Sequence, residues 1–500
     1  MKRLARTSAL TSALTSALSL ALAACSLAPH YQTPVPPVPL SWPLGDAYLA
    51  QSEANLPTVS YTEIFRDPRL QQLITSALAN NRDLRVAAAN LAASRAQVRV
   101  IRADQFPQIG VTGGASYSDN GTSTTSTGTG GVGGGGTGGT GNAVTVSRKG
   151  WSYSLQGSIS SFELDFFGKY ANATEAQRNT ALATEAAART VRLGLIADLA
   201  QAWAQYGADR ELLGIAQDTA KNAQRSVELT GARLRGGISP RTDLRQAEQV
   251  LETARGDVAT QQAALAQDVN AIRLLVGADF DTALLPASIA DVTGALAVLP
   301  AGTSSQVLLR RPDVVEAEYQ LRAANADIGV ARAQLFPSIS LTGLLGFASN
   351  ALSALFDSGS FRWSAGGNAS YSIFNAGGRR ANVDVSEAQR DAALANYERA
   401  VQTAFREVSD ALADQGTLGE RLRAARANTA AAADTARLTD ATYRYGVQSF
   451  LSSLDAQRSL YSAQRSQIAT ELALASNRVT LYRVLGGDAA TATAAELPRP

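Results

Sequence analysis

Cysteine and histidine supply most soft metal sites and nucleophile pairs, and this sequence contains one of each, Cys25 and His30. A single thiol and a single imidazole cannot assemble a zinc-type cluster or a Cys–His nucleophile pair. The carboxylates lie at helical spacing among basic residues, a pattern typical of solvated ion pairs. The sequence therefore predicts no enzymatic centre, no resident metal and no cofactor.

The first segment of the chain resembles a bacterial lipoprotein signal. It opens with three basic residues, Lys2, Arg3 and Arg6, and continues with a short apolar stretch. This pattern is typical of a secretory signal rather than a membrane span. The sequence Leu-Ala-Ala-Cys at 22–25 resembles a lipobox, which implies removal of residues 1–24 and N-palmitoyl and S-diacylglycerol groups on Cys25. Ser26 is not acidic, and lipoproteins resembling this one go to the outer membrane unless an acidic residue there retains them. The alternative is an ordinary signal with a cysteine there by chance.

Charge argues against nucleic acid as a partner. The whole chain has a net charge of +2. Removing residues 1–24 takes away three basic residues and no acidic ones, so the mature chain is close to neutral. The basic surface that nucleic-acid binding needs is therefore not expected.

The spacing of proline separates an extended leader from long helices. Prolines crowd the start of the mature chain, so residues 25–68 are predicted to be a lipidated, proline-rich leader. Residues 171–235 and 379–444 contain no proline and are rich in strong helix formers. At 1.5 Å per residue, each run would be about 100 Å long as one helix. Helices of that length are expected in a coiled coil or a helical barrel.

An internal repeat divides the remaining chain. Phe106-Pro107 corresponds to Phe336-Pro337, and Trp151 corresponds to Trp363. We assign residues 69–277 to repeat 1 and 312–486 to repeat 2, each with the order helix, strand, loop, strand, long helix, turn, helix. Residues 278–311 join the repeats and 487–500 form a tail. Repeat 1 carries an insertion rich in glycine, threonine and serine, so 118–150 is predicted to be a loop.

Each repeat contains two segments that read as transmembrane β-strands. Apolar and polar residues alternate in four segments of about ten residues, predicted at about 107–118, 151–162, 337–348 and 362–374. Residues 105–118 and 337–355 contain no Asp, Glu, Lys or Arg. A soluble β-sandwich is the alternative, but the lack of charge favours membrane strands.

Four strands per chain require other copies to complete a barrel. An open sheet edge in hydrocarbon leaves backbone hydrogen-bonding groups unsatisfied. Two copies would supply eight strands and three would supply twelve, and periodicity does not choose between them.

Several motifs resemble those of TolC-type outer-membrane efflux lipoproteins, in the NodT/OprM-like branch. They are Phe65 to Leu70, Glu163 to Lys169, the Arg-Arg-Pro-Asp stretch from Arg310 to Ile339, and Ile373 to Arg379. The resemblance extends from about residue 30 to 487. It implies a mixed α and β membrane protein: a homotrimer with a twelve-stranded outer-membrane β-barrel, continued by a long periplasmic α-helical barrel. Residues 278–311 would belong to an equatorial girdle.

The resemblance also implies a function. Such proteins are passive exit channels that receive small molecules or drugs from a periplasmic adaptor (a membrane fusion protein) and an inner-membrane pump of the resistance-nodulation-division (RND) class. The alternative is the outer-membrane channel of a type I protein secretion system, although the lipobox favours efflux. An enzyme or adhesin on a barrel is a third possibility, with no residue constellation to support it.

Control of the channel is expected at the turns between long and short helices. These periplasmic tips are predicted at about 233–244 and 443–455. Gly237 and Gly446 suit a helix reversal that needs positive φ.

The resemblance assigns gate residues at these tips. Thr242 and Asp243 match positions that clasp neighbouring helices, and Tyr443 and Asp455 match a tyrosine and a constriction aspartate. Two positions depart from the pattern. Gln448 stands where some members have arginine, and Ser452 stands where some have a further aspartate.

Structural roles compete with the functional ones. An aspartate in the first turn of a helix commonly caps it. Arg310, Arg311 and Asp313 are expected to be structural, with Pro312 and Asp313 at a helix start and the arginines paired nearby.

Overall fold

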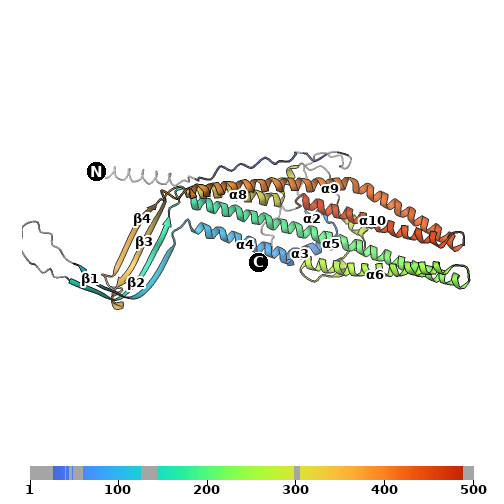
Figure 1. Ribbon diagram of the computed structural model, residues 1–500, viewed down its shortest axis with the longest axis horizontal. Coiled ribbons are helices and arrows are strands. Elements are labelled where there is room, and N and C mark those ends of the chain that lie inside the picture. The colour runs from blue at the N-terminus through green and yellow to red at the C-terminus, as the bar shows by residue number, and fades with distance from the viewer. Residues whose placement is uncertain are drawn as a thin grey trace, which may run out of the picture. The chain divides into compact units, whose positions relative to one another are not determined.

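The computed structural model describes residues 26–39, 41–43, 45, 48, 60–125, 144–297 and 305–487 (Figure 1). The signal segment 1–24, Cys25, the centre of the glycine-rich tract and the tail from residue 488 lie outside the described residues. The chain forms two compact units. One comprises residues 1–31, 97–177 and 324–390, and the other comprises 32–96, 178–323 and 391–500. Each unit contains segments from both predicted repeats. The boundaries proposed for the repeats therefore stay a prediction.

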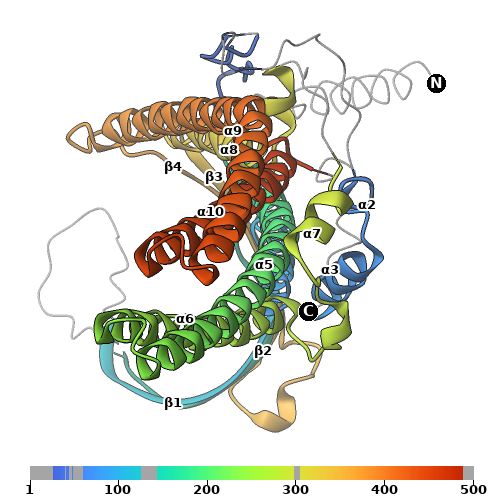
Figure 2. The ribbon, with the colours of Figure 1, turned by 90° about the vertical axis from the view of Figure 1, so that its right-hand side faces the viewer.

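The first unit contains one antiparallel sheet. Its strands are β1 (Ile109–Thr125), β2 (Val144–Glu163), β3 (Ser338–Ser349) and β4 (Phe361–Ser370), in the order β1-β2-β3-β4. In Figure 2, β1 and β2 follow a curved path. The register shifts between Asp119 and Thr122 in β1 and between Ile159 and Phe162 in β2. Such irregularities bend a strand and increase its twist.

The strand ends differ from the prediction. The proposed loop at 118–150 is wrong at both ends, because β1 continues to Thr125 and β2 begins at Val144. Backbone pairing extends into the tract, down to Thr125 opposite Val144. The strand proposed at 362–374 ends earlier, at Ser370. A segment rich in threonine and serine is typical of a loop, but its backbone can pair in a sheet when a partner strand lies beside it.

Two helices of 67 residues follow the strand pairs. They are α5 (Lys169–Arg235) and α9 (Gly378–Arg444), and each is about 100 Å long at 1.5 Å per residue. Each is followed by a shorter helix, α6 (Arg241–Val276) or α10 (Phe450–Val484). The predicted long runs are confirmed to within two residues.

The second unit contains most of these two hairpins, α5–α6 and α9–α10, seen in Figure 2. Trp203, Ile196 and Leu199 of α5 are completely buried, as are Tyr397 and Val401 of α9. Many other buried positions are alanine, which allows close contact between helices. Burial of these side chains stabilises the hairpins.

Shorter helices precede the sheet and connect the repeats. Before β1 come α2 (Tyr61–Ile64), α3 (Pro68–Asn80) and α4 (Arg82–Ala103), and before β3 comes α8 (Pro312–Ala333). The connection holds η1 (Thr282–Leu284), α7 (Ile289–Ala295) and η2 (Ser305–Arg310), and η3 (Leu352–Ala354) lies between β3 and β4. Within the motif from Phe65 to Leu70, Asp67 caps α3 by accepting a 2.8 Å hydrogen bond from the backbone N–H of Arg69.

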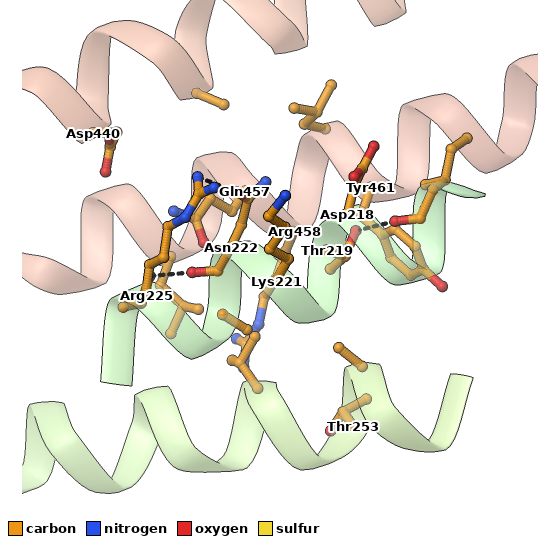
Figure 3. Close-up of a pocket in the computed structure, with 18 of the residues that line it drawn as sticks. Asp218, Thr219, Lys221, Asn222, Arg225, Thr253, Asp440, Gln457, Arg458 and Tyr461 are labelled. Atoms are coloured by element: carbon orange, nitrogen blue, oxygen red, sulfur yellow. Dashed lines mark hydrogen bonds between the residues drawn. The ribbon is translucent and has the colours of Figure 1, made fainter. Parts of the chain in front are cut away.

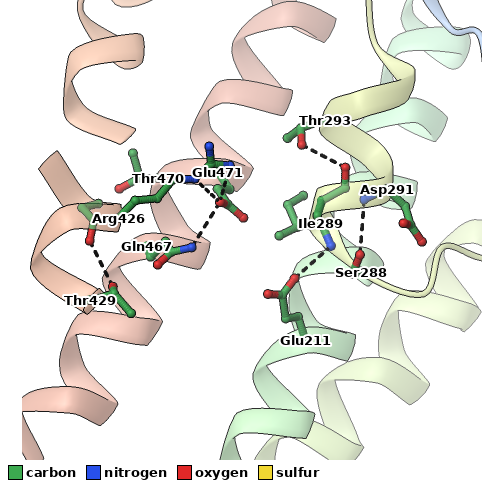
Figure 4. Close-up of polar contacts among 12 residues, drawn as sticks. Glu211, Ser288, Ile289, Asp291, Thr293, Arg426, Thr429, Gln467, Thr470 and Glu471 are labelled. Atoms are coloured by element: carbon green, nitrogen blue, oxygen red, sulfur yellow. Dashed lines mark hydrogen bonds and ion pairs between the residues drawn. The ribbon is translucent and has the colours of Figure 1, made fainter. Parts of the chain in front are cut away.

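The connecting segment packs against the hairpins within the second unit. The indole Nε1 of Trp203 donates to the carbonyl oxygen of Leu284 at 3.0 Å. The Glu211 carboxylate accepts a 3.2 Å hydrogen bond from the backbone N–H of Ile289 at the start of α7 (Figure 4). Phe65 also forms an antiparallel bridge with Leu296. The connecting segment therefore packs on α5 at Trp203 and Glu211, and its end pairs with Phe65. Its assignment to a girdle stays a prediction.

Figure 4 also shows an ion pair that joins the helices of the second hairpin. Glu471 of α10 is 3% exposed. Its Oε1 atom accepts hydrogen bonds from Nε and Nη2 of Arg426 on α9, at 3.1 and 2.9 Å. Because the acceptor is buried, this pair fixes the register between α9 and α10.

The start of the mature chain lies against α8 within the first unit. Ser26 Oγ donates to Asn172 Oδ1 at 2.8 Å, and Asn325 Nδ2 donates to the carbonyl oxygen of Pro29 at 2.8 Å. Gly329 allows this close approach. A Cβ at that position would lie 2.5 Å from Asn172 Nδ2 and 2.8 Å from the backbone nitrogen of Ala28.

Candidate functional site: the sheet and the hairpin tips

The sheet register separates an apolar face from a polar face. Apolar residues or glycines lie opposite one another on one face, for example Tyr117 opposite Trp151 and Leu345 opposite Trp363. On the other face, Ser116 lies opposite Ser152 and Thr112 opposite Gln156. Leu344, the exception to the predicted alternation, lies on the polar face between Ser158 and Ser364. A sheet of this kind can face lipid on one side and water on the other.

The apolar face is exposed in the single chain. The exposed fractions are 73% for Val111, 62% for Leu345 and 72% for Trp363. Tyr117, Trp151 and Tyr153 form an aromatic group, with ring centroids 5.4 and 5.9 Å apart for successive pairs. Exposed apolar surface of this extent needs a covering medium or partner.

Both edges of the sheet are open within the described residues. β1 pairs only with β2, and β4 pairs only with β3. All residues of β4 are exposed. Each edge therefore presents unpaired backbone groups that another strand could satisfy.

The two helix hairpins reverse through equivalent turns. Gly237 has a φ of +71° and Gly446 a φ of +77°, the left-handed conformation predicted for these glycines. Ile238 donates its N–H to the carbonyl of Arg233, and Val447 donates to that of Thr442, at 2.8 and 2.9 Å. The N–H groups of Gly237 and Gly446 donate to the carbonyls of Leu234 and Tyr443, each at 3.0 Å, and the two bonds together form a Schellman motif at the end of each long helix.

A small apolar cluster joins the tips of the two hairpins. Tyr443, Phe450 and Leu454 of the second hairpin pack with Ala247 of the first. The Tyr443 and Phe450 ring centroids are 5.5 Å apart. Burial raises the pKa of the Tyr443 hydroxyl; the Arg233 cation lowers it and Asp243 raises it. Tyr443 is thus a neutral core residue of the tip in this structure.

Arg233 contacts Tyr443 from the opposite hairpin. Its Nη1 atom donates to the carbonyl oxygen of Tyr443 at 3.1 Å. Its Cζ atom lies 4.7 Å from the centroid of the Tyr443 ring. One side chain of α5 therefore makes both a cation–π contact and a hydrogen bond with the end of α9.

The other predicted tip residues make few contacts. In the described part of the chain, the side chains of Thr242, Asp243 and Asp455 form no hydrogen bond or ion pair, and Thr242 and Asp455 are exposed. Gln448 is likewise exposed. Ser452 supplies the N–H that Ser449 caps: this N–H donates to Ser449 Oγ at 3.4 Å, at the start of α10. The gate assignments stay predictions.

A cavity of about 1040 Å³ lies between the two hairpins beyond the tip cluster (Figure 3). All four hairpin helices line it, and its walls carry Lys221, Arg225 and Arg458. Tyr461 of α10 spans one end, where its hydroxyl donates to Asp257 Oδ2 of α6 at 2.9 Å. Burial and this hydrogen bond raise the pKa of Tyr461, so the hydroxyl remains a donor at neutral pH.

Sequence reasoning missed the contacts that join the hairpins. Arg233, Asp257 and Tyr461 were not among the predicted site residues. Arg233 lies in the last turn of a helix, where a basic residue is common and gives no sign of a partner from another hairpin. Ser449 had a local signal, because serine before an apolar helical residue is a typical N-cap.

Neither metal chemistry nor a membrane helix appears in the described ranges. Within them, no three or more His, Cys, Asp or Glu side chains come together in a way that could hold a metal ion. Among the same residues, we find no helix with the length and hydropathy that a membrane span requires.

Comparison with known proteins places this architecture in a family. The family model described as "Outer membrane efflux protein" matches residues 73–278 and 303–487. The "Probable efflux pump outer membrane protein TtgC" of Pseudomonas putida is 40% identical over 467 residues, which cover 93% of this chain and 92% of that protein. The "Cation efflux system protein CusC" of Escherichia coli K12 is 38% identical over 465 residues, covering 93% and 96%.

Solved structures share the fold. A crystal structure of CusC has a TM-score of 0.78 at 38% identity and covers 93% of this chain and 100% of that chain. The open state of the MtrE outer membrane channel of Neisseria gonorrhoeae has a TM-score of 0.78 at 32% identity, with 95% and 99% covered. These likenesses confirm the predicted fold class, a four-stranded sheet combined with long helical hairpins. The chain therefore belongs to the outer membrane efflux protein family, as an outer membrane transport protein rather than an enzyme.

Proposed function

We propose that three copies of this chain form a passive exit channel through the outer membrane, closed at rest by the tips of the helix hairpins. The observation that carries the proposal is the two-faced sheet with open edges at β1 and β4. Unpaired backbone groups in hydrocarbon are costly, so each edge needs a strand from another copy. Three sheets of four strands give a closed barrel of twelve.

The polar face of the sheet would then line a water-filled lumen. Its side chains are mainly serine, threonine, glutamine and asparagine, as at Ser116, Thr112 and Asn368. A wall of small neutral polar groups suits passage rather than tight recognition. Cargo selection and energy would therefore come from a periplasmic adaptor and an inner-membrane RND transporter.

The relatives' names support efflux of small solutes over protein secretion. They include a "Toluene efflux pump outer membrane protein" and a "Cation efflux system protein". We place this chain in the same type of tripartite pump, with small molecules or drugs as cargo.

Lipid on Cys25 would anchor each copy to the membrane as N-palmitoyl and S-diacylglycerol groups. The contacts of Ser26 and Pro29 with Asn172 and Asn325 support this arrangement, because they hold the residues directly after Cys25 against the first unit. Several acyl chains together give stable anchoring where one chain alone would not.

The gate would consist of Asp243 and Asp455 with Thr242 and Tyr443. The exposure of Asp455 and its lack of a partner among the described residues support a position facing the pore. In a trimer each aspartate would form a three-fold ring of like charge, which attracts cations.

Paired cysteine substitutions test the trimeric barrel directly. Cys25 is the only natural cysteine, so an introduced pair supplies the only other thiols. Thr112→Cys on β1 would be combined in turn with Ser364→Cys, Gly366→Cys and Asn368→Cys on the polar face of β4. Oxidation should convert at least one pair into covalent trimers, because β1 of each copy would lie beside β4 of the next.

Each single-cysteine variant is the control, since it cannot join two different edges. If every pair remained monomeric after oxidation, and the purified protein were also a monomer in detergent, the trimeric channel would be wrong. Reconstituted trimers should conduct in planar bilayers.

A further inference from the structure

Two contacts tie the hairpins together across the cavity. At the tip, Arg233 of α5 binds the ring and carbonyl oxygen of Tyr443 on α9. At the other end, Tyr461 of α10 binds Asp257 of α6. The cavity between them is lined on α5 by residues from Ile215 to Leu229, so Arg233 lies just beyond its tip-side end.

Because the cavity separates the two hairpins, few other contacts hold them together there. Dispersion contacts require atoms within about 4 Å, and facing surfaces across an open space of about 1040 Å³ lose them. The tip of one hairpin is therefore held to the other by the small cluster around Tyr443 and by the Arg233 contact. The open space also leaves room for one tip to move relative to the other.

One position in the second tip lacks the positive charge that some similar sequences carry there. Residue 448 is a glutamine that is exposed and has no hydrogen-bonding side-chain contact among the described residues. Arg444 of the second tip pairs with Asp440 of its own helix, whereas Arg233 reaches this tip from the first hairpin. A guanidinium suits this place, because it can stack on an aromatic ring while donating to a carbonyl at the end of a helix.

We propose that Arg233 is the latch that holds the α9–α10 tip in its closed position, and that the tip moves outward when this contact breaks. The inference rests on the proposed function, a channel gated at its hairpin tips. Arg233 acts as a positioning residue: it fixes the tip that carries Tyr443 and Asp455 rather than touching the transported solute.

Single-channel recording in planar bilayers tests the latch. Arg233→Gln should raise the open probability on the order of tenfold, which corresponds to about 1.4 kcal/mol. Arg235→Gln is the matched control. Arg235 is exposed, lies in the same last turn of α5, and makes no hydrogen bond or ion pair among the described residues. Its open probability should equal that of the wild type.

A conservative variant and a double mutant separate the latch from a general loss of structure. Arg233→Lys keeps the charge without the planar stacking, so it should give an intermediate open probability. In a Tyr443→Leu background, Arg233→Gln should have a much smaller effect, because the ring that it binds is already gone. Each variant would first be shown to be trimeric by native electrophoresis.

The outcomes distinguish the two proposals. If the wild type forms neither trimers nor channels, the proposed function fails. If the wild type conducts and Arg233→Gln or a folded Arg233→Lys matches it, or if the effects of Arg233→Gln and Tyr443→Leu simply add, the latch is wrong while the channel stands.

Discussion

Nη1 of Arg311 donates a 2.9 Å hydrogen bond to the carbonyl oxygen of Val484, so the residue before α8 closes the last turn of α10. The same guanidinium forms ion pairs with Asp313 at 2.7 Å and Glu407 at 2.8 Å. Arg311 is 6% exposed. The Arg-Arg-Pro-Asp motif thus has a structural role: through Arg311 it joins the start of α8 to α9 and to the end of α10.

Replacing Arg311 with alanine should destabilise the second unit. The change leaves the buried Val484 carbonyl without its donor, while Asp313 and Glu407, which are 41% and 36% exposed, can be solvated, so the expected cost is about 1–3 kcal/mol. Unfolding in detergent, followed by circular dichroism, would measure the loss. Arg310→Ala is the control, because Arg310 is exposed, and it should change stability by less than about 0.5 kcal/mol. Equal stability of the two variants would contradict this role.

The burial of Asp268 should make the free energy of unfolding depend on pH. Asp268 lies on α6 with a buried Oδ2 atom that has no hydrogen-bond partner among the described residues. Burial and the nearby Asp209 carboxylate of α5 raise the pKa of Asp268 to about 7 from 3.8. Between these two values the folded chain keeps a proton that the unfolded chain releases, so this group makes the protein less stable as pH rises toward 7.

Asp268→Asn should remove that dependence, since asparagine stays neutral. The variant should melt at a higher temperature than the wild type at pH 8, and the two should converge near pH 4. Melting temperatures across this range would test the prediction. Asp410→Asn, an exposed aspartate on α9, should follow the wild type. A wild-type difference between pH 4 and pH 8 that persists unchanged in Asp268→Asn would count against it.

Gly329 should not tolerate a side chain. Its Cβ would lie 2.5 Å from Asn172 Nδ2 and 2.8 Å from the Ala28 nitrogen, so the start of the mature chain must shift. Gly329→Ala should cost about 1–3 kcal/mol, as overpacking typically does. Faster hydrogen exchange in residues 26–30 would show the release of the segment.

Gly419→Ala is the matched control for Gly329→Ala. Gly419 also lies inside a helix, but a Cβ there would meet no atom within 4 Å. It should leave exchange in residues 26–30 unchanged and stabilise the helix by about 1 kcal/mol. If both alanine variants behaved alike, the close approach would not be the reason for glycine.

Asp455→Ala should increase single-channel conductance. The change would remove a three-fold ring of carboxylates from the closed tip, which also lowers the preference for cations. Current in planar bilayers at matched salt would measure both effects. Gln448→Ala, which removes no charge, should preserve the selectivity. An unchanged, nearly closed channel in Asp455→Ala would argue that this aspartate is only a surface residue.

Cys25→Ser should abolish labelling by a fatty-acid analogue in cells. The thiol is the attachment point in the proposed lipidation, and serine cannot carry the thioether. Ser26→Ala keeps the cysteine and should retain the label. Persistent labelling of Cys25→Ser would require another attachment site.

Local sequence was sufficient for much of the fold. The proline-free runs and the left-handed glycines predicted α5, α6, α9 and both tip turns, because helix formation and helix termination depend on residues close in the chain. The strand prediction found all four strands but misplaced their ends. Threonine and serine near residue 120 favour turns in isolation, and they join the sheet because β2 lies beside them.

The sequence by itself determined the two-faced strands, the repeat and the long helices, and its motifs pointed to an outer-membrane channel. Only the tertiary structure decided which side chains meet: Arg311 with Glu407, Asp268 with Asp209, and Arg233 with Tyr443. The reason is physical. Periodicity follows from the geometry of one element, whereas a pairing between residues 210 positions apart depends on how two hairpins pack.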